Sequence, residues 1–360
     1  MTYTELLSHY KNNQFRFIDT QENATKFYLL RSISKKKTIK KFCELYKLEE
    51  NIDSIFKNKD ITCKHIIDFI RTEFKVKTDT EIKNIEAELN KMQYFDWGGS
   101  MGNNLEKNIV NNYIKKIFKY EEIEKAIMNS IYKSVYGYTL NSWYNHWSSI
   151  IIEEIFNGNS KVLPTIDLVE KIDFFIDDIP FDLKVTYFPE ELMKEKMASI
   201  LLDKYGNKTE LTCTKKIAKN LNITIPNDLN DRSLNICLQS LINERKSFDK
   251  RAKSFIQDIK DIKKKIIDYY MNNPNELIIW LYENQGEMRF DAANRFYVIL
   301  IDSKNIFDSW KLKRNVSLLK ETINKKINFF NKSKLNYIKF HWNKNDRTYE
   351  CISEILFIIN

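Results

Sequence analysis

Cysteine is scarce in this chain of 360 residues, and the cysteines are not arranged in pairs. The five of them are scattered, and no C-x-x-C pair occurs: Cys43, Cys63, Cys213, Cys237 and Cys351. An odd, dispersed set argues against a disulfide framework or a zinc knuckle and is typical of a reducing compartment. The four histidines are also dispersed and form no H-E-x-x-H motif, so we expect no zinc site of that kind.

Apolar runs long enough to cross a membrane are missing as well. No stretch approaches the ~20 apolar residues that a spanning helix needs. The first residues, MTYTELLSHYKNN, contain no apolar core of a secretory signal. We therefore expect a soluble, cytoplasmic protein with no membrane partner.

Glycine is rare, with seven residues in the chain. Three of the seven fall in one segment, YFDWGGSMGNN at Tyr94–Asn104. Glycine gives this backbone the freedom for a tight turn or for close approach to a ligand, and both interpretations stay open. No Gly-Lys-Ser/Thr follows, which excludes a phosphate loop of the ATPase type. Glu106, just after the segment, could also approach an active site.

Positive charge is abundant. The formal net charge is +9, and the sequence pI is about 9.0. A basic balance favours an anionic partner such as nucleic acid. A second explanation is open, because a chain rich in Lys, Asn and Ile also arises from an AT-rich genome. With 43% hydrophobic residues, the chain can bury a sizeable core.

Apolar residues at spacings of three and four predict helices over most of the chain. We expect a helical N-terminal region at 1–92 and a helical insertion at 191–274, separated by the first part of a core at 93–190. Pro274 is expected to end the insertion, because proline breaks helices. The segment after it, ELIIWLYENQ, is predicted to begin a strand-rich second part of the core at 275–360.

The second part of the core contains a predicted central strand and a terminal hairpin. NRFYVILID at Asn294–Asp302 is a near-continuous apolar run, typical of a strand covered on both faces. A helix is expected at Asp308–Phe330, and the tail predicts a hairpin with its turn at Asn343–Asp346. The predicted fold is therefore mixed α/β, with a small central sheet flanked by helices and large helical additions.

The segment KIDFFIDDIPFDLKVTYF, at Lys171–Phe188, predicts two short strands joined by a turn at DDIP. Side chains alternate along a strand, so Asp182 and Lys184 share a face while the leucine between them points into the core. If Asp173 faces the same side across the hairpin, two carboxylates and one ammonium converge. Such a set can hold a hard divalent cation beside a phosphodiester and activate a water.

A predicted helix before the hairpin carries two adjacent acidic residues. VYGYTLNSWYNHWSSIIIEEIF, at Val135–Phe156, places Trp143, Trp147 and Glu154 on one helical stripe. Acidic residues are seldom buried without a partner. Glu154, or its neighbour Glu153, could therefore be held near a cation. Exposure of both to solvent at the helix end is the alternative.

Other candidate residues rank lower. Asp167, in the strand-like VLPTIDLV, is a rival for the first carboxylate, but Asp173 is embedded in the hairpin strand itself. His146 has no second ligand at i+3 or i+4 and is expected to be a packed or surface histidine. His341, followed by two nearby asparagines, faintly suggests an HNH nuclease, although the other histidines lie far upstream.

The spacing of the hairpin residues resembles that of a known nuclease superfamily. Asp173, eight intervening residues and then the D-L-K triplet Asp182–Lys184, behind an acidic helix, resemble the PD-(D/E)xK nucleases. Within that superfamily the pattern looks most like a type II restriction endonuclease. The proline in the family's name is missing here, since Lys-Ile stands before Asp173. The resemblance implies a restriction-endonuclease-like central sheet.

The resemblance also implies a role for each residue. Asp173 and Asp182 would be metal ligands. Lys184 would orient or activate the water and stabilise the charge that develops on phosphorus. Glu154 or Glu153 would complete or extend the metal site.

From these observations we expect a Mg²⁺-dependent DNA endonuclease that uses one or two ions. Mg²⁺ suits an all-oxygen site. A type II restriction enzyme would recognise a short sequence of double-stranded DNA, and a palindromic target would imply a homodimer. The rival is a non-catalytic helical nucleic-acid-binding or scaffold protein. Its hairpin would be degenerate, with Asp and Lys forming cross-strand ion pairs of little energetic value.

Overall fold

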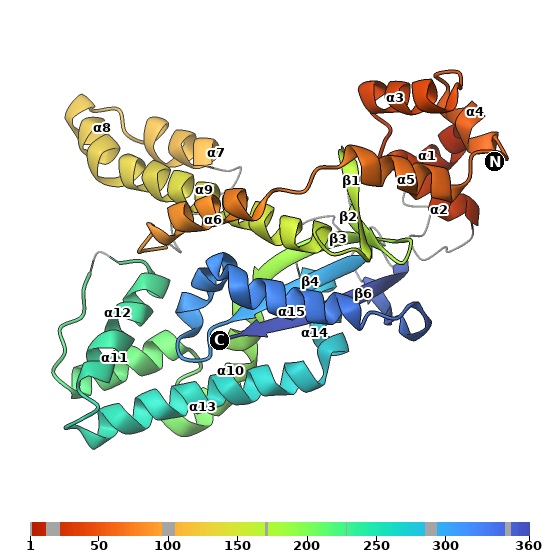
Figure 1. Cartoon of the computed structure of the whole chain (residues 1–360). Helices are drawn as coiled ribbons and strands as arrows, with labels where there is room; N and C mark the ends of the chain where they lie inside the picture. The colour runs from red at the N-terminus through yellow and green to blue at the C-terminus, as the bar shows by residue number, and fades with distance from the viewer. Residues whose placement is uncertain are drawn as a thin grey trace.

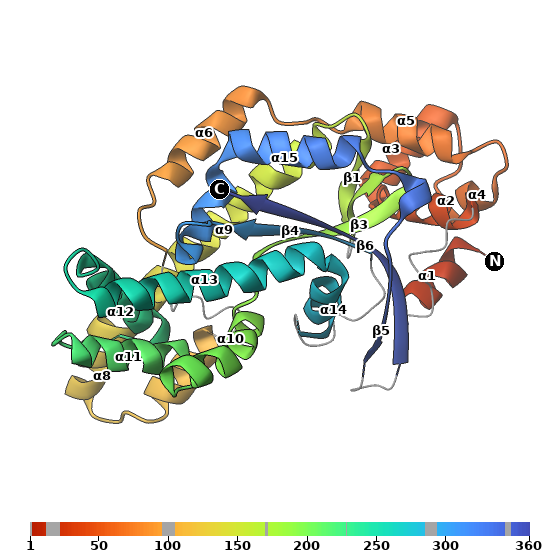
Figure 2. The same cartoon turned by 90° about the horizontal axis from the view of Figure 1, so that it is seen from below.

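A six-stranded mixed sheet lies at the centre of the computed structural model, with helices on both of its faces (Figures 1 and 2). The predicted mixed α/β class is therefore confirmed. The structure describes residues 2–11, 22–95, 105–169, 172–227, 229–284, 294–342 and 347–360. The glycine-rich segment from residue 96 onward and the predicted turn at Asn343–Asp346 lie outside these ranges.

The strands occur in the order β1-β2-β3-β4-β6-β5 across the sheet. Their bounds are β1 Val162–Val169, β2 Ile172–Ile176, β3 Ile179–Tyr187, β4 Arg295–Ile301, β5 Tyr337–Trp342 and β6 Arg347–Ile359. β1, β2 and β3 form an antiparallel meander, and β5 is antiparallel to β6. The three central strands β3, β4 and β6 are parallel to one another. The predicted terminal hairpin is present as β5 and β6.

β4 is the buried central strand that its apolar sequence predicts, since every residue from Arg295 to Ile301 is buried. Its side chains alternate between two cores. Phe296, Val298 and Leu300 face one core, and Tyr297, Ile299 and Ile301 face the other. The side chains of β4 thus contribute to both layers of the protein.

The N-terminal region is helical, as predicted, and it packs at the β1–β2 edge of the sheet (Figure 1). Its helices are α1 Tyr3–Lys11, α2 Glu22–Arg31, α3 Lys36–Tyr46, α4 Ile52–Lys57, α5 Cys63–Glu73 and α6 Asp79–Asn90. Leu163, Ile172 and Phe175 of the first two strands belong to the core that these helices form. α6 instead joins the core on one face of the sheet.

One face of the sheet is covered by α6, by the second half of α9 (Tyr132–Asn157) and by α15 (Val316–Asn328) (Figure 2). Trp143 packs against this core, but Trp147 is 36% exposed, so the predicted stripe is wrong at Trp147. The first half of α9 leaves the sheet and continues a projecting arm (Figure 1). The rest of the arm is formed by α7 Leu105–Ile109, η2 Val110–Ile114, α8 Tyr120–Ala126 and η3 Ile127–Ile131.

The opposite face is covered by the helices that connect β3 to β4 (Figure 2). They are α10 Glu190–Tyr205, α11 Glu210–Asn220, α12 Asp231–Glu244, α13 Lys250–Asn272 and α14 Pro274–Asn284. The predicted strand ELIIWLYENQ is wrong, because it forms α14. Pro274 begins this helix, where a missing N–H costs nothing, and Leu277, Ile278, Leu281 and Tyr282 fall at helical spacing on its buried side.

The segment between β4 and β5 is helical, as expected, but it is divided into two helices. η4 (Ile306–Arg314) is a 3-10 helix, and α15 follows it after Asn315. The Asn315 side chain accepts a hydrogen bond from the Leu318 backbone N–H and so caps the second helix. A short 3-10 turn, η5 (Lys332–Lys334), leads into β5. Among the described helices, none is both long enough and apolar enough to span a membrane.

Candidate active site

The β2–β3 hairpin is closed by a turn of two aspartates. Asp177 and Asp178 have φ values of 49° and 68°. Two consecutive positive φ values are those of a type I′ turn, whose twist matches that of the flanking strands. The turn is shorter than the predicted DDIP break, because Ile179 and Pro180 already belong to β3.

The two predicted carboxylates meet at the open end of this hairpin. Phe174 pairs with Phe181, and one further step along the same register sets Asp173 opposite Asp182. There the Asp173 carboxylate accepts a hydrogen bond from the backbone N–H of Leu183 at 2.6 Å. The hairpin therefore brings together the two acids that the D-x₈-D spacing singled out.

Asp173 is an unusually basic carboxyl group. Its pKa is raised to about 6, mainly by burial and also by the nearby Asp182 carboxylate. The Leu183 N–H and the Lys184 ammonium act in the opposite direction, because both stabilise the charged form. Two carboxyl groups in contact favour a cation or a shared proton between them.

Asp182 is buried, with 7% of its surface exposed, and two cations lie beside it. The Lys184 ammonium pairs with Asp182 Oδ1. Arg295 Nε lies 3.6 Å from Asp182 Oδ2. Lys184 is more accessible, with a side chain 29% exposed, so it is the partner that can move.

Arg295 is a site residue that sequence reasoning missed. It is 2% exposed and begins β4 directly beside Asp182 in the parallel register. Its guanidinium donates to Tyr297 Oη at 3.2 Å and lies 4.6 Å from the centre of the Tyr282 ring. A signal was present in the sequence, since a lone charge opens the apolar run RFYVILI.

Glu153 and Glu154 of α9 lie in different surroundings. Glu153 keeps contact with solvent, while partial burial of its carboxyl raises its pKa to about 7. The charge of Asp173 is the next cause of this shift, which places Glu153 at the edge of the hairpin site.

Glu154 is held away from the hairpin site. Its carboxylate accepts a hydrogen bond from the Lys77 backbone N–H at 2.9 Å, and the Lys77 ammonium lies 3.8 Å away. These contacts correct the assignment of Glu154 to the metal set. Of the two glutamates, only Glu153 lies near the aspartates.

The lower-ranked candidates lie elsewhere. Asp167 is buried and accepts hydrogen bonds from the Lys35 backbone N–H at 2.7 Å and from Thr38 Oγ1 at 2.9 Å, so it anchors the start of α3. His146 is exposed beside Trp147. His341 lies on β5. Glu106 is exposed on α7, in the projecting arm.

The donor set of the hairpin suits a hard divalent cation, since it offers only carboxylate oxygens. As the side chains stand, no three His, Cys, Asp or Glu residues within the described ranges are arranged to hold a metal. The Lys184 ammonium takes up one oxygen of Asp182. Burial is the main cause of the raised pKa values of Asp173 and Glu153, and a nearby cation would stabilise the charged form of both. The donor chemistry therefore fits Mg²⁺ once Lys184 leaves Asp182.

Comparisons with protein-family models, with curated proteins and with solved structures find no match to this chain.

Proposed function

We propose that this protein is a Mg²⁺-dependent DNA endonuclease, of the type II restriction enzyme kind, that acts on a short specific sequence of double-stranded DNA. The observation that supports the proposal is the meeting of Asp173, Asp182 and Lys184 at the open end of one hairpin. The raised pKa of Asp173 beside Asp182 adds to it. Perturbed carboxyl groups of this kind are common at catalytic sites.

In this proposal Asp173 and Asp182 hold one or two Mg²⁺ ions, and Glu153 extends the set. The bound ion would supply Lewis-acid stabilisation of the phosphodiester oxygens and lower the pKa of the attacking water. Lys184 would move from Asp182 to the phosphate, where its ammonium offsets the developing negative charge. Arg295 would stay behind as a fixed cation and hold the Asp182 carboxylate in place.

The direct test is plasmid cleavage, measured with Mg²⁺ and with EDTA. It compares the parent with the isosteric variant Asp182→Asn and the truncated variant Lys184→Ala. We expect the parent to cut only with Mg²⁺ and each variant to lose at least a hundredfold in rate. Asp178→Asn is the matched control, because it removes a carboxylate from the same hairpin at the exposed turn. Variants that remain folded and cut at the parent rate would exclude this site.

Partner binding follows from the charge balance of the chain. The formal net charge of +9 favours contact with DNA phosphates, and such binding weakens steeply with salt. A palindromic recognition sequence would require a two-fold homodimer, because each active site cuts one strand. Digestion of an unmethylated phage genome, followed by sequencing of the fragment ends, would give both the recognition sequence and the cut position.

The alternative is a non-catalytic nucleic-acid-binding or scaffold protein, and one observation favours it. Asp182 already has the Lys184 ammonium and the Arg295 guanidinium beside it, so the charge of this carboxylate is balanced without a metal. This alternative predicts salt-sensitive DNA binding that EDTA does not change. A Mg²⁺-dependent rise in melting temperature that Asp173→Asn abolishes would contradict it.

A further inference from the structure

Two adjoining cavities lie at the carboxyl ends of the parallel strands, away from the hairpin site. Their volumes are about 600 and 560 Å³, and Lys263, Ile306 and Phe307 line both of them. The larger cavity reaches Ile301 at the end of β4, and the smaller one reaches Tyr187 at the end of β3. This is the edge of an α/β sheet at which ligands commonly bind. The proposed nuclease residues line neither cavity.

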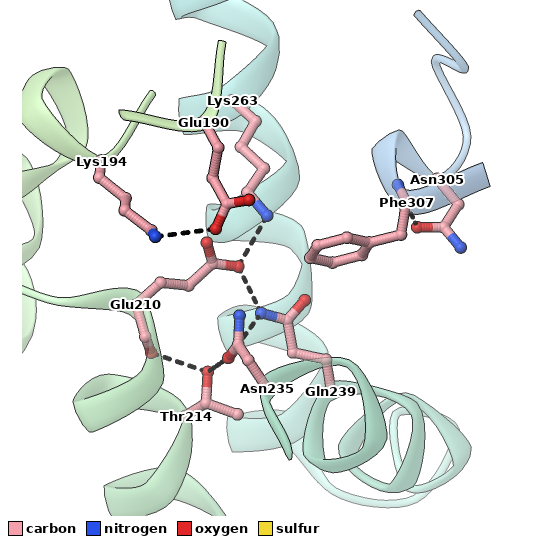
Figure 3. Close-up of polar contacts among 9 residues, drawn as sticks. All are labelled: Glu190, Lys194, Glu210, Thr214, Asn235, Gln239, Lys263, Asn305 and Phe307. Carbon is pink, nitrogen blue, oxygen red and sulfur yellow. Dashed lines mark hydrogen bonds and ion pairs between the residues drawn. The ribbon is translucent and has the colours of Figure 1, made fainter. Parts of the chain in front are cut away.

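A polar network lies where the two cavities adjoin, because Gln239 lines the larger one, Glu210 and Asn235 line the smaller one, and Lys263 lines both. Figure 3 shows the network. The Lys263 ammonium donates to Glu210 Oε1 at 2.7 Å, and both side chains are largely covered, at 12% and 15% exposure. The Gln239 amide donates to the same oxygen. Asn235 accepts from Gln239 at 3.3 Å and from Thr214 Oγ1 at 2.9 Å. The network therefore fixes Glu210 in one orientation.

The fixed carboxylate presents an oxygen to the smaller cavity. Both donors use Glu210 Oε1, and Oε2 has no partner within the described ranges. Figure 3 shows this second oxygen turned away from Gln239, toward the space beside Glu190. Glu190 is already paired with Lys194 at 2.8 Å and with Arg232 at 2.9 Å. Oε2 of Glu210 is therefore the acceptor that a ligand donor would meet.

Part of the lining beside this acceptor is apolar. Apolar side chains from α10, α11 and the end of β3 line the smaller cavity: Phe188, Met193, Met197, Leu201 and Leu211. The Phe307 ring closes one side (Figure 3). The backbone that carries this ring is held by the Asn305 side chain, which accepts from the Phe307 N–H at 3.2 Å. Asp302 Oδ1 in turn accepts from the N–H groups of Lys304 and Asn305, each at 2.9 Å.

Positive charge surrounds the larger cavity. Four lysines line it against two aspartates: Lys260, Lys263, Lys264 and Lys304 against Asp268 and Asp302. An anionic group is favoured on this side of Phe307. The smaller cavity offers an anion no such excess, because its four cations, Lys194, Lys208, Arg232 and Lys263, are matched by four carboxylates, Glu190, Glu195, Glu210 and Asp231.

We propose that this pair of cavities binds a nucleotide. The base would lie in the smaller cavity against Phe307 and the methionines and donate a ring or exocyclic N–H to Glu210 Oε2. The phosphate would reach the lysines of the larger cavity, past Lys263. A nucleotide combines a largely apolar flat body, a donor edge and a terminal anion. The inference goes beyond the proposed nuclease and does not rest on it.

The test is isothermal titration of the full chain with the four nucleoside monophosphates, their nucleosides and inorganic phosphate, in EDTA. The Asp182→Asn background removes one carboxylate of the hairpin site from the measurement. We expect saturable binding of at least one monophosphate, with its nucleoside weaker and phosphate alone weakest. Glu210→Gln should weaken nucleoside and nucleotide alike by about tenfold, which is the effect of one charge-assisted hydrogen bond.

Lysine variants distinguish the contribution of the phosphate to binding from that of the nucleoside. Lys264 and Lys304 are exposed, so replacing both with Ala should leave folding intact and weaken the monophosphate while leaving the nucleoside unchanged. Lys265→Ala, one residue along α13 and outside both cavities, is the matched control. A 5′-phosphorylated tetranucleotide that binds more tightly than any monophosphate would identify a strand end as the source of the nucleotide. Absence of binding by every monophosphate at millimolar concentration would overturn the proposal.

Discussion

The balance of charge around Asp182 decides how the hairpin can act. Three carboxyl groups, Asp173, Asp182 and Glu153, lie near two cations, Lys184 and Arg295. The two cations differ in burial, because Arg295 is enclosed while Lys184 reaches solvent. A metal could therefore replace Lys184 beside Asp182, while Arg295 would still balance the Asp182 charge.

Arg295→Leu tests the fixed cation. Removing one partner of a buried ionic contact leaves the other charge unpaired, which typically costs about 3 kcal/mol of unfolding free energy. We expect a loss of this order in urea denaturation. Arg251→Gln, at an exposed pair, should leave the midpoint unchanged. An Arg295 variant as stable as the parent would show that Lys184 alone balances Asp182.

Asp173 makes the stability of the protein depend on pH in a defined direction. Its pKa is raised from an ordinary value of about 3.9 to about 6, so the folded state holds this proton more tightly than the unfolded state. The resulting stabilisation is complete below about pH 4 and is lost as pH rises through about 6.

Asp173→Asn removes the group whose proton binding differs between the folded and unfolded states. The stability of the variant should fall less than that of the parent between pH 4.5 and pH 7.5, and at pH 7.5 the variant should be the more stable of the two. Denaturant titrations at both pH values measure this difference. Parallel curves for the two proteins would contradict the raised pKa. Cleavage by the parent, which needs the ionised carboxylate, should increase over the same range.

At the scale of single residues, the sequence predicted the two aspartates and the lysine but not their surroundings. Spacing along a hairpin is local, so the D-x₈-D-x-K pattern could place Asp173 opposite Asp182. Arg295 could not be assigned to the site, because its contact with Asp182 crosses more than a hundred residues of chain. Likewise, helical spacing alone could not show which of Glu153 and Glu154 faces the site. That assignment depends on the position of Lys77, which binds Glu154.

At the scale of elements, α9 connects the site to the N-terminal region through its two glutamates. Glu154→Ala removes the acceptor of the Lys77 N–H and should lower the unfolding free energy by about 1 kcal/mol with little effect on cleavage. Glu153→Ala should do the reverse, with cleavage at least tenfold slower and an unchanged melting temperature. Melting curves and plasmid cleavage of both variants form one experiment. Equal effects of the two changes would contradict the separate roles.

The β2–β3 turn offers a stabilising change. Asp178 has a φ of 68°, which glycine adopts more easily than aspartate. Asp178→Gly, combined with Asp177→Asn, gives the Asn-Gly pair that type I′ turns prefer. We expect a gain of about 0.5 kcal/mol in unfolding free energy and an unchanged cleavage rate. A lower melting temperature would show that the aspartates make contacts beyond the turn.

Elements with a clear period were predicted well, and boundaries set by long-range packing were not. The apolar run of β4 and the hairpin of β2 and β3 follow from their own residues. ELIIWLYEN is apolar enough for a strand or a helix, and its packing under the sheet as α14 decides between them. The helical spacing of the insertion does not show where α12 ends, and a break follows Glu244 before Asp249, whose side chain caps α13.

At the scale of the whole molecule, the projecting arm is the part whose apolar surface is least covered. Residues 105–136 contain no buried side chain. Large apolar groups are exposed along it, with Phe118 at 91%, Tyr120 at 73%, Met128 at 67% and Tyr132 at 62%. Helices without a packed face are marginal in water. Exposed patches of this kind mark interaction sites.

The distribution of charge along the arm leads us to expect a second copy of the chain as its partner. Residues 105–119 carry four lysines and one glutamate, while residues 120–126 carry three glutamates and one lysine. Two arms packed antiparallel would set each basic segment against an acidic one. We expect the parent to sediment as a dimer and Phe118→Ser with Tyr132→Ser to sediment as a monomer. A monomeric parent at tens of micromolar would exclude this association.

The route of the chain through the sheet has a consequence for the protein during its synthesis. β3 and β4 are neighbours, yet the five helices α10 to α14 separate them in sequence. A ribosome therefore releases the acidic hairpin long before Arg295 emerges to neutralise it. Until then Asp182 lacks the buried Arg295 beside it, and β3 lacks its neighbour β4. If the protein is the nuclease that we propose, its site can be complete only after β4 has been translated.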